Sequence, residues 1–182
     1  MKIRRDNKNV VTLTFRRSEL LYDIKNYAYI EGDIKKVEDE HSRHQLMDIG
    51  EDGNIDRVTR VLNLVFAHCV EMCYPYSKVP VSEKDGTYEM TTDDALKEKE
   101  EYIMQLSLPD MASQTSVTLL VNLIHEYLVC KVLADWMTLT DNDGSGARKA
   151  AHWEQKAEDA RSSVVGTLNA RCRRTRRTLS PF

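Results

Sequence analysis

Apolar positions at helical spacing run through most of the chain, and the longest such stretch is Ser116–Leu139. Its apolar residues follow the i, i+3, i+4, i+7 spacing of one helix face, and further apolar residues extend beyond that face. We therefore predict a central helix that other helices cover on more than one side. Polar residues interrupt the run, which a lipid bilayer would penalise, so the pattern favours a core helix over a membrane span. The first face comprises Val117, Leu120, Leu123, Ile124, Tyr127, Leu128, Val132 and Trp136.

Three other stretches also place apolar residues on one helical face. Residues 18–32 form the first, with Ser18 as a candidate cap, and residues 55–74 the second, with Asp52 or Asn54 as caps and Pro75 as its end. Residues 147–171 form the third, and their mostly small inward side chains would let another helix approach closely. The inward residues are Leu20, Leu21, Ile24, Tyr27 and Ala28, then Ile55, Val58, Val61, Leu62, Val65, Phe66, Cys69 and Cys73, then Ala150, Trp153, Ala157, Ala160, Val164, Thr167 and Leu168.

A further helix is predicted for residues 91–106, because hydroxyl and acidic residues at its start are typical of a helix N-terminus. Pro109 would end it, and its inward residues would be Ala95, Leu96, Tyr102, Ile103 and Leu106. Residues 33–52 are acidic and weakly periodic, which indicates an exposed connection with at most a short helix at 37–47.

In one segment apolar and polar residues alternate instead of following helical spacing. Val11, Leu13 and Phe15 are apolar while their neighbours are polar, so residues 9–16 are expected to form a strand or extended arm. We predict a strand without a partner in its own chain, in which these three residues support strand addition, and residues 78–81 and 86–90 are candidates for a small hairpin or for pairing with another chain.

The resulting fold class is mainly α, a helical bundle of four to five helices with a short N-terminal strand or arm. We divide the chain into a basic arm at 1–17, a helical domain at 18–170 and a basic tail at 171–182. With 182 residues the chain is long enough to bury a sizeable core. No secretory signal is visible, so we expect a protein made in the cytosol, and the four cysteines form no CxxC pair that would indicate a metal site.

Charge is strongly segregated, although the net charge is only −3. Residues 18–170 hold 28 acidic and 15 basic side chains, whereas both ends are basic. The C-terminal cluster of Arg171, Arg173, Arg174, Arg176 and Arg177 could bind a polyanion such as DNA, contact an acidic subunit surface, or complement the dipole of the last helix.

Candidate chemistry is sparse. The loop at 141–146 begins like a calcium loop but has His152 where a bidentate glutamate is needed, and His41 and His44 at i, i+3 could share a metal but lack companion ligands. His68 and His125 lie within predicted core helices, and no nucleophile or phosphate-binding motif is present. We assign no catalytic residue, metal or cofactor and expect a protein that is not an enzyme.

The segments SELLYDIKNYAYIEGD at 18–33 and IDRVTRVLNLVFAHCVEMCYPYSK at 55–78 resemble the entry to the small helical head–tail connector (adaptor) proteins of tailed bacteriophages. The resemblance implies a virion protein that packs side by side with copies of itself in a ring, between portal and tail proteins, without a membrane. An acidic body would let DNA pass such a ring without sticking. The alternatives are a nucleic-acid-binding accessory protein that uses the arginine tail, and a metal-dependent enzyme that uses His41 and His44.

Overall fold

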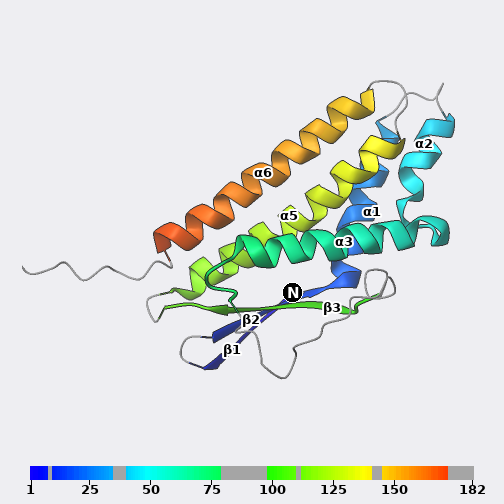
Figure 1. Cartoon of the computed structure of the whole chain (residues 1–182). Coiled ribbons are helices and arrows are strands. Elements are labelled where there is room, and N and C mark those ends of the chain that lie inside the picture. The colour runs from blue at the N-terminus through cyan, green and yellow to red at the C-terminus, as the bar shows by residue number, and fades with distance from the viewer. Residues whose placement is uncertain (8–9, 35–39, 79–97, 110–111, 141–144, 172–182) are drawn as a thin grey trace, which may run out of the picture.

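The structure is a computed structural model that describes residues 1–7, 10–34, 40–78, 98–109, 112–140 and 145–171. The predicted mainly α fold is confirmed, with a small antiparallel sheet added to the helices (Figure 1). In chain order the elements are β1 (Lys2–Asn7), β2 (Val10–Arg16), α1 (Arg17–Asp33), α2 (Glu40–Met47), the 3₁₀ turn η2 (Asp48–Gly50), α3 (Asp52–Met72), β3 (Glu101–Ser107), α5 (Gln114–Thr140) and α6 (Ser145–Arg171).

Helix α5 is the centre of the molecule, as the apolar pattern predicted. Helices α1, α3 and α6 all pack against it (Figure 1). Its side chains are buried in several directions, for example Leu120, Leu128 and Leu133 at 0% exposure. It is long and apolar enough to cross a membrane, and 61% of its most apolar window is buried by the rest of the described chain.

The helices around α5 occupy different sides of it. The ring of His125 contacts Asp23 of α1, and the indole of Trp136 donates a hydrogen bond to the carbonyl of Leu46 at 3.1 Å. Because successive residues turn by about 100°, His125 and Trp136 both project roughly 180–200° away from Tyr127. Helices α1 and α2 therefore cover the side of α5 that is opposite Tyr127.

Helix α6 runs beside α5 as its antiparallel partner (Figure 1). All its predicted inward positions are buried, from Ala150 at 7% exposure to Val164 at 0%. Most of these side chains are small, which lets the two helix backbones approach closely. The ring of Trp153 also packs edge-on against Tyr27 of α1, with the centroids 5.1 Å apart, so α6 is tied to α1 as well.

The sheet has the order β1-β2-β3, and both neighbours of β2 are antiparallel to it. One face of the sheet packs on the helices. Phe66 of α3 contacts Phe15 of β2 and Tyr102 of β3, and the Tyr102 hydroxyl donates to the side-chain oxygen of Asn63 at 2.9 Å. Strands β1 and β2 therefore share one core with the helices, since Val11, Leu13 and Phe15 belong to it and Ile3 packs against it.

The prediction of a helix at 91–106 is wrong for the part that the structure describes, because residues 101–107 form β3. Tyr102, Met104 and Leu106 are buried and alternate with exposed residues, whereas Ile103, expected to face inward, is 55% exposed. Tyr102 and Leu106 are four residues apart, which fits a helix as well as a strand, and pairing with β2 selects the strand.

The predicted helix caps are also wrong. The N-cap positions of α1 and α3 are Arg16 and Glu51, and neither makes a side-chain cap hydrogen bond. The side chain of Asn54 instead donates to the carbonyl of Asp48 at 2.9 Å, so it holds η2 against the start of α3. The acidic connection contains more order than expected, since 40–47 and 48–50 are helical.

Candidate functional site

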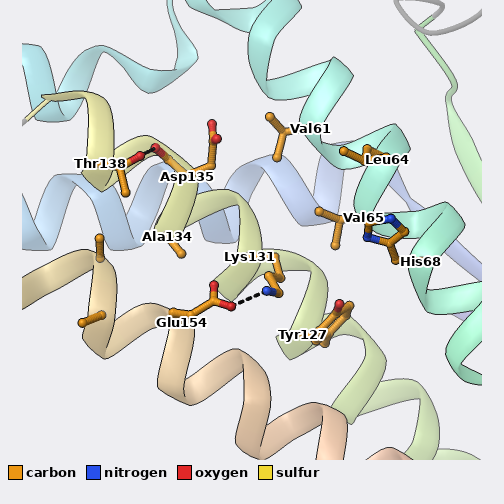
Figure 2. A pocket seen from close by; sticks show the side chains of 12 residues that line it. Val61, Leu64, Val65, His68, Tyr127, Lys131, Ala134, Asp135, Thr138 and Glu154 are labelled. Carbon is orange, nitrogen blue, oxygen red and sulfur yellow. Dashed lines mark hydrogen bonds and ion pairs between the residues drawn. The ribbon is translucent and has the colours of Figure 1, made fainter. Parts of the chain in front are cut away.

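A groove lies over α5, between α3 and α6. One section has a volume of about 500 Å³ and the next about 480 Å³, and both sections share His68, Tyr127 and Lys131. Figure 2 shows the first section, with Val61, Leu64, Val65 and His68 of α3 on one side and Glu154 of α6 on the other. Tyr127 belongs to the side of α5 that α1 leaves free.

The floor of this groove is apolar and its rim is charged. Val65, Tyr127, Ala134 and Ala150 form buried parts of the lining, whereas Leu64 is 57% exposed on the α3 wall. Such a surface suits the apolar face of a partner helix or an extended segment.

The charged side chains at the rim are paired between α5 and the helix on either side of the groove. Lys131 of α5 forms an ion pair with Glu154 of α6 (Figure 2), and Arg57 of α3 makes a two-pronged pair with Asp135, with both N–O distances at 3.1 Å. Lys131 and Asp135 are one turn apart on α5, so the two pairs connect three helices. Paired side chains of this kind orient a ligand more readily than they transfer protons to it.

The buried thiols are chemically quiet. A hydrogen bond to Cys73 and burial both raise the pKa of the Cys69 thiol. Burial, followed by the nearby Glu126 carboxylate, raises the pKa of the Cys130 thiol to about 12. A thiol that stays protonated at neutral pH is a poor nucleophile and a poor metal ligand, so these cysteines act as core residues.

The described histidines do not assemble a metal site. His125 Nε2 lies 2.6 Å from Asp23 Oδ2 and is the polar link between α5 and α1. His44 is exposed on α2, His41 is the second residue of the same helix, and His68 is exposed on the groove wall. Among the described residues no group of three or more metal-binding side chains occurs. The start of the candidate calcium loop, 141–144, lies outside the described residues, and Ser145 and Gly146 already belong to α6.

A second candidate surface lies on α1, on the side of α5 opposite the groove. We call it the α1 stripe, and it consists of Tyr22, Tyr29 and Ile30 of α1 together with Ile34, the C-cap residue that follows the helix. Tyr22 is 70% exposed and Ile34 72% exposed, while Leu20, Ile24 and Ala28 of the same segment are buried. Large exposed apolar and tyrosine side chains gathered on one helix face are typical of protein interaction sites.

The residues that the sequence singled out for strand addition are in the core. Val11, Leu13 and Phe15 are at most 6% exposed, and their strand β2 is paired on both sides, by β1 and by β3. The expectation of an N-terminal strand without a partner in its own chain is therefore wrong. The outer backbone edges of the sheet belong to β1 and β3.

The arginine cluster is described only in part. Arg171 is the last residue of α6, and Arg173, Arg174, Arg176 and Arg177 lie outside the described residues. Of the candidate strands at 78–81 and 86–90, the structure describes only Lys78.

Sequence reasoning missed both the groove and the α1 stripe, although a signal for each was present. Leu64, Tyr22, Tyr29 and Ile30 are all apolar or aromatic residues that fall off the inward faces predicted for their helices. Such surplus apolar residues mark a second contact surface on a helix. Comparison with protein-family models, with curated proteins and with solved structures finds no match to this chain.

Proposed function

We propose that this chain is a non-enzymatic structural protein, a subunit of the head–tail connector ring at the neck of a tailed bacteriophage. It would be made in the bacterial cytoplasm and incorporated into the virion, where it contacts copies of itself and portal or tail proteins. The proposal starts from the resemblance of residues 18–33 and 55–78 to the head–tail connector proteins of tailed bacteriophages. The observation that carries it is the α1 stripe, because Tyr22, Tyr29 and Ile34 are highly exposed along one side of this segment, and exposed tyrosine and apolar side chains are typical of protein contact surfaces.

The arrangement of the two surfaces supports ring assembly. A ring of identical subunits needs two different patches on each subunit, since each copy contacts one neighbour with one patch and the other neighbour with the second. The α1 stripe and the groove are different surfaces on opposite sides of α5. A chain built in this way has a surface for each of two neighbours.

The chemistry of the groove supports binding over catalysis. Its lining residues Lys131, Glu154 and Asp135 are engaged in ion pairs, and the Thr138 hydroxyl donates to the backbone carbonyl of Asp135 at 2.6 Å. These groups therefore already have partners within the chain.

The test is the solution mass of the full-length chain, measured by light scattering at low and at moderate salt. We expect a discrete multimer, and we expect the variant Tyr29→Ser/Ile34→Ser to shift it toward monomer. Leu139→Ser is the matched control, because Leu139 is 47% exposed but is not one of the stripe residues. A native chain that stays monomeric at every salt and protein concentration would contradict self-assembly.

A second candidate function is nucleic-acid binding, and the arginine cluster Arg171–Arg177 favours it because arginine pairs well with phosphate. Its test is the affinity of the chain for double-stranded DNA as a function of salt. A steep loss of affinity with salt, removed by deletion of residues 171–182, would support this function. Salt-independent or undetectable binding would contradict it.

A further inference from the structure

Each outer strand of the sheet turns one row of backbone hydrogen-bonding groups away from β2. The N–H of Ser107 points away from β2, since it donates to the carbonyl of Tyr76 at 2.8 Å. In a strand, backbone groups point to alternate edges, so the N–H and C=O groups of Glu101, Ile103 and Gln105 also face outward. Within the part of the chain that the structure describes, no strand pairs with that edge of β3 or with the outer edge of β1.

The two edges carry opposite charge. Strand β1 contains Lys2, Arg4 and Arg5 against one acidic residue, Asp6. The segment 98–107, which enters and forms β3, contains three acidic residues, Glu98, Glu100 and Glu101, against Lys99. Natural sheets often protect exposed edges with charged side chains, and in this sheet the charges at the two edges are of opposite sign. Two copies of the chain can therefore bring unlike edges together.

We propose that β1 of one copy adds to the outer edge of β3 of the next copy, so that the sheets of neighbouring subunits join into one continuous sheet. This inference rests on the proposed assembly into a ring and adds a backbone contact between neighbours to the two side-chain surfaces described above. Because β1 and β3 are each antiparallel to β2, they run parallel to one another, and a head-to-tail neighbour presents its β1 parallel to β3. Its backbone then pairs with Glu101, Ile103 and Gln105.

The direction of the strands also aligns the charges. The basic residues Lys2, Arg4 and Arg5 begin β1, and the acidic residues Glu100 and Glu101 lead into β3, so a parallel arrangement brings the two charged ends together. The contact would also cover Ile103, which is 55% exposed on the outer strand. Backbone pairing supplies affinity, and the unlike charges exclude pairing of β1 with β1 or of β3 with β3.

Charge reversal of each edge tests this contact in the full-length chain. We expect Arg4→Glu/Arg5→Glu and, separately, Glu100→Lys/Glu101→Lys to weaken assembly by about tenfold or more, because each places like charges opposite one another. The chain that carries all four substitutions is expected to regain assembly, since its edges are again unlike. The readout is the mass distribution by light scattering over a range of protein concentrations, with circular dichroism to show that each variant is folded.

The matched control is Arg60→Glu/Arg148→Glu, which reverses two exposed cations on α3 and α6, away from the sheet. It should assemble like the native chain. If the native chain is a multimer and neither edge reversal changes its mass, the edge contact is overturned and the proposed function stands. If the fourfold variant is folded but stays dissociated like its parents, the edge contact is also overturned. A native chain that is monomeric throughout overturns both.

Discussion

The two sides of α5 are built differently. On the side of α1 and α2, Trp136 is 5% exposed and its indole donates to the carbonyl of Leu46, while His125 is held against Asp23. On the groove side, the polar contacts are ion pairs between partly exposed side chains, such as Arg57 with Asp135. The first side is closed by the chain itself, and the second is left as a concave surface.

This difference separates residues that maintain the fold from residues available for binding. Buried polar contacts are costly to break, because they leave a group without a partner away from water. Exposed ion pairs contribute little to stability, and their loss is compensated by solvent. Substitutions on the two sides of α5 should therefore affect different measurements.

The largest effect is expected for Trp136→Ala. The substitution removes a large buried side chain and leaves the Leu46 carbonyl without its donor, so the free energy of unfolding should fall by about 3–5 kcal/mol. The measurement is urea-induced unfolding. Leu139→Ala, in a 47% exposed position on the same helix, is the control and should change stability by less than about 0.5 kcal/mol. Equal losses in the two variants would show that the closed side does not govern stability.

Elements with a strong local pattern could be predicted from the sequence, whereas elements that depend on distant pairing could not. Helices α5 and α6 were predictable because their apolar residues are numerous and periodic, and burial follows that pattern from Val117 to Leu168. Strand β3 was not, because its seven residues fit both a helix and a strand and the decision depends on pairing with β2, which is about 90 residues away in sequence. Strand β1 is mostly charged and gave no alternating pattern, so only its pairing partner reveals it.

The interaction surfaces were harder to predict for a related reason. A groove exists only where three helices meet, and no single segment encodes it. Leu64 looks in the sequence like any other apolar residue of its helix, and its position at an open wall follows from where α6 stops covering α5. To predict that the two sheet edges differ in charge likewise requires the strand order, because this order places the basic and the acidic segments at opposite edges of one sheet.

A smaller effect is expected at alkaline pH, on the side of α5 that carries Cys130. Burial raises the pKa of this thiol from its usual value of 9.0 to about 12, so between these values the folded state keeps a proton that the unfolded state has lost. The free energy of unfolding should then fall as the pH rises above 9, by up to about 1.4 kcal/mol per pH unit from this group. Unfolding in urea from pH 8 to 10.5 would measure this, with Cys130→Ala giving a shallower slope. An unchanged slope in Cys130→Ala would exclude the thiol as a source.

The smallest effect on stability is expected for Leu64→Ala on the groove wall. Leu64 is already 57% exposed, so its truncation removes little buried surface and should change the free energy of unfolding by less than about 0.5 kcal/mol. Leu62 is the matched control, because it is the same residue type on the same helix but is fully buried, and Leu62→Ala should cost about 2–5 kcal/mol. Both values come from urea unfolding of the full-length chain. If Leu64→Ala proved as destabilising as Leu62→Ala, the groove wall would be part of the core that holds α3 on α5, and the groove could not be treated as a surface left free for a partner.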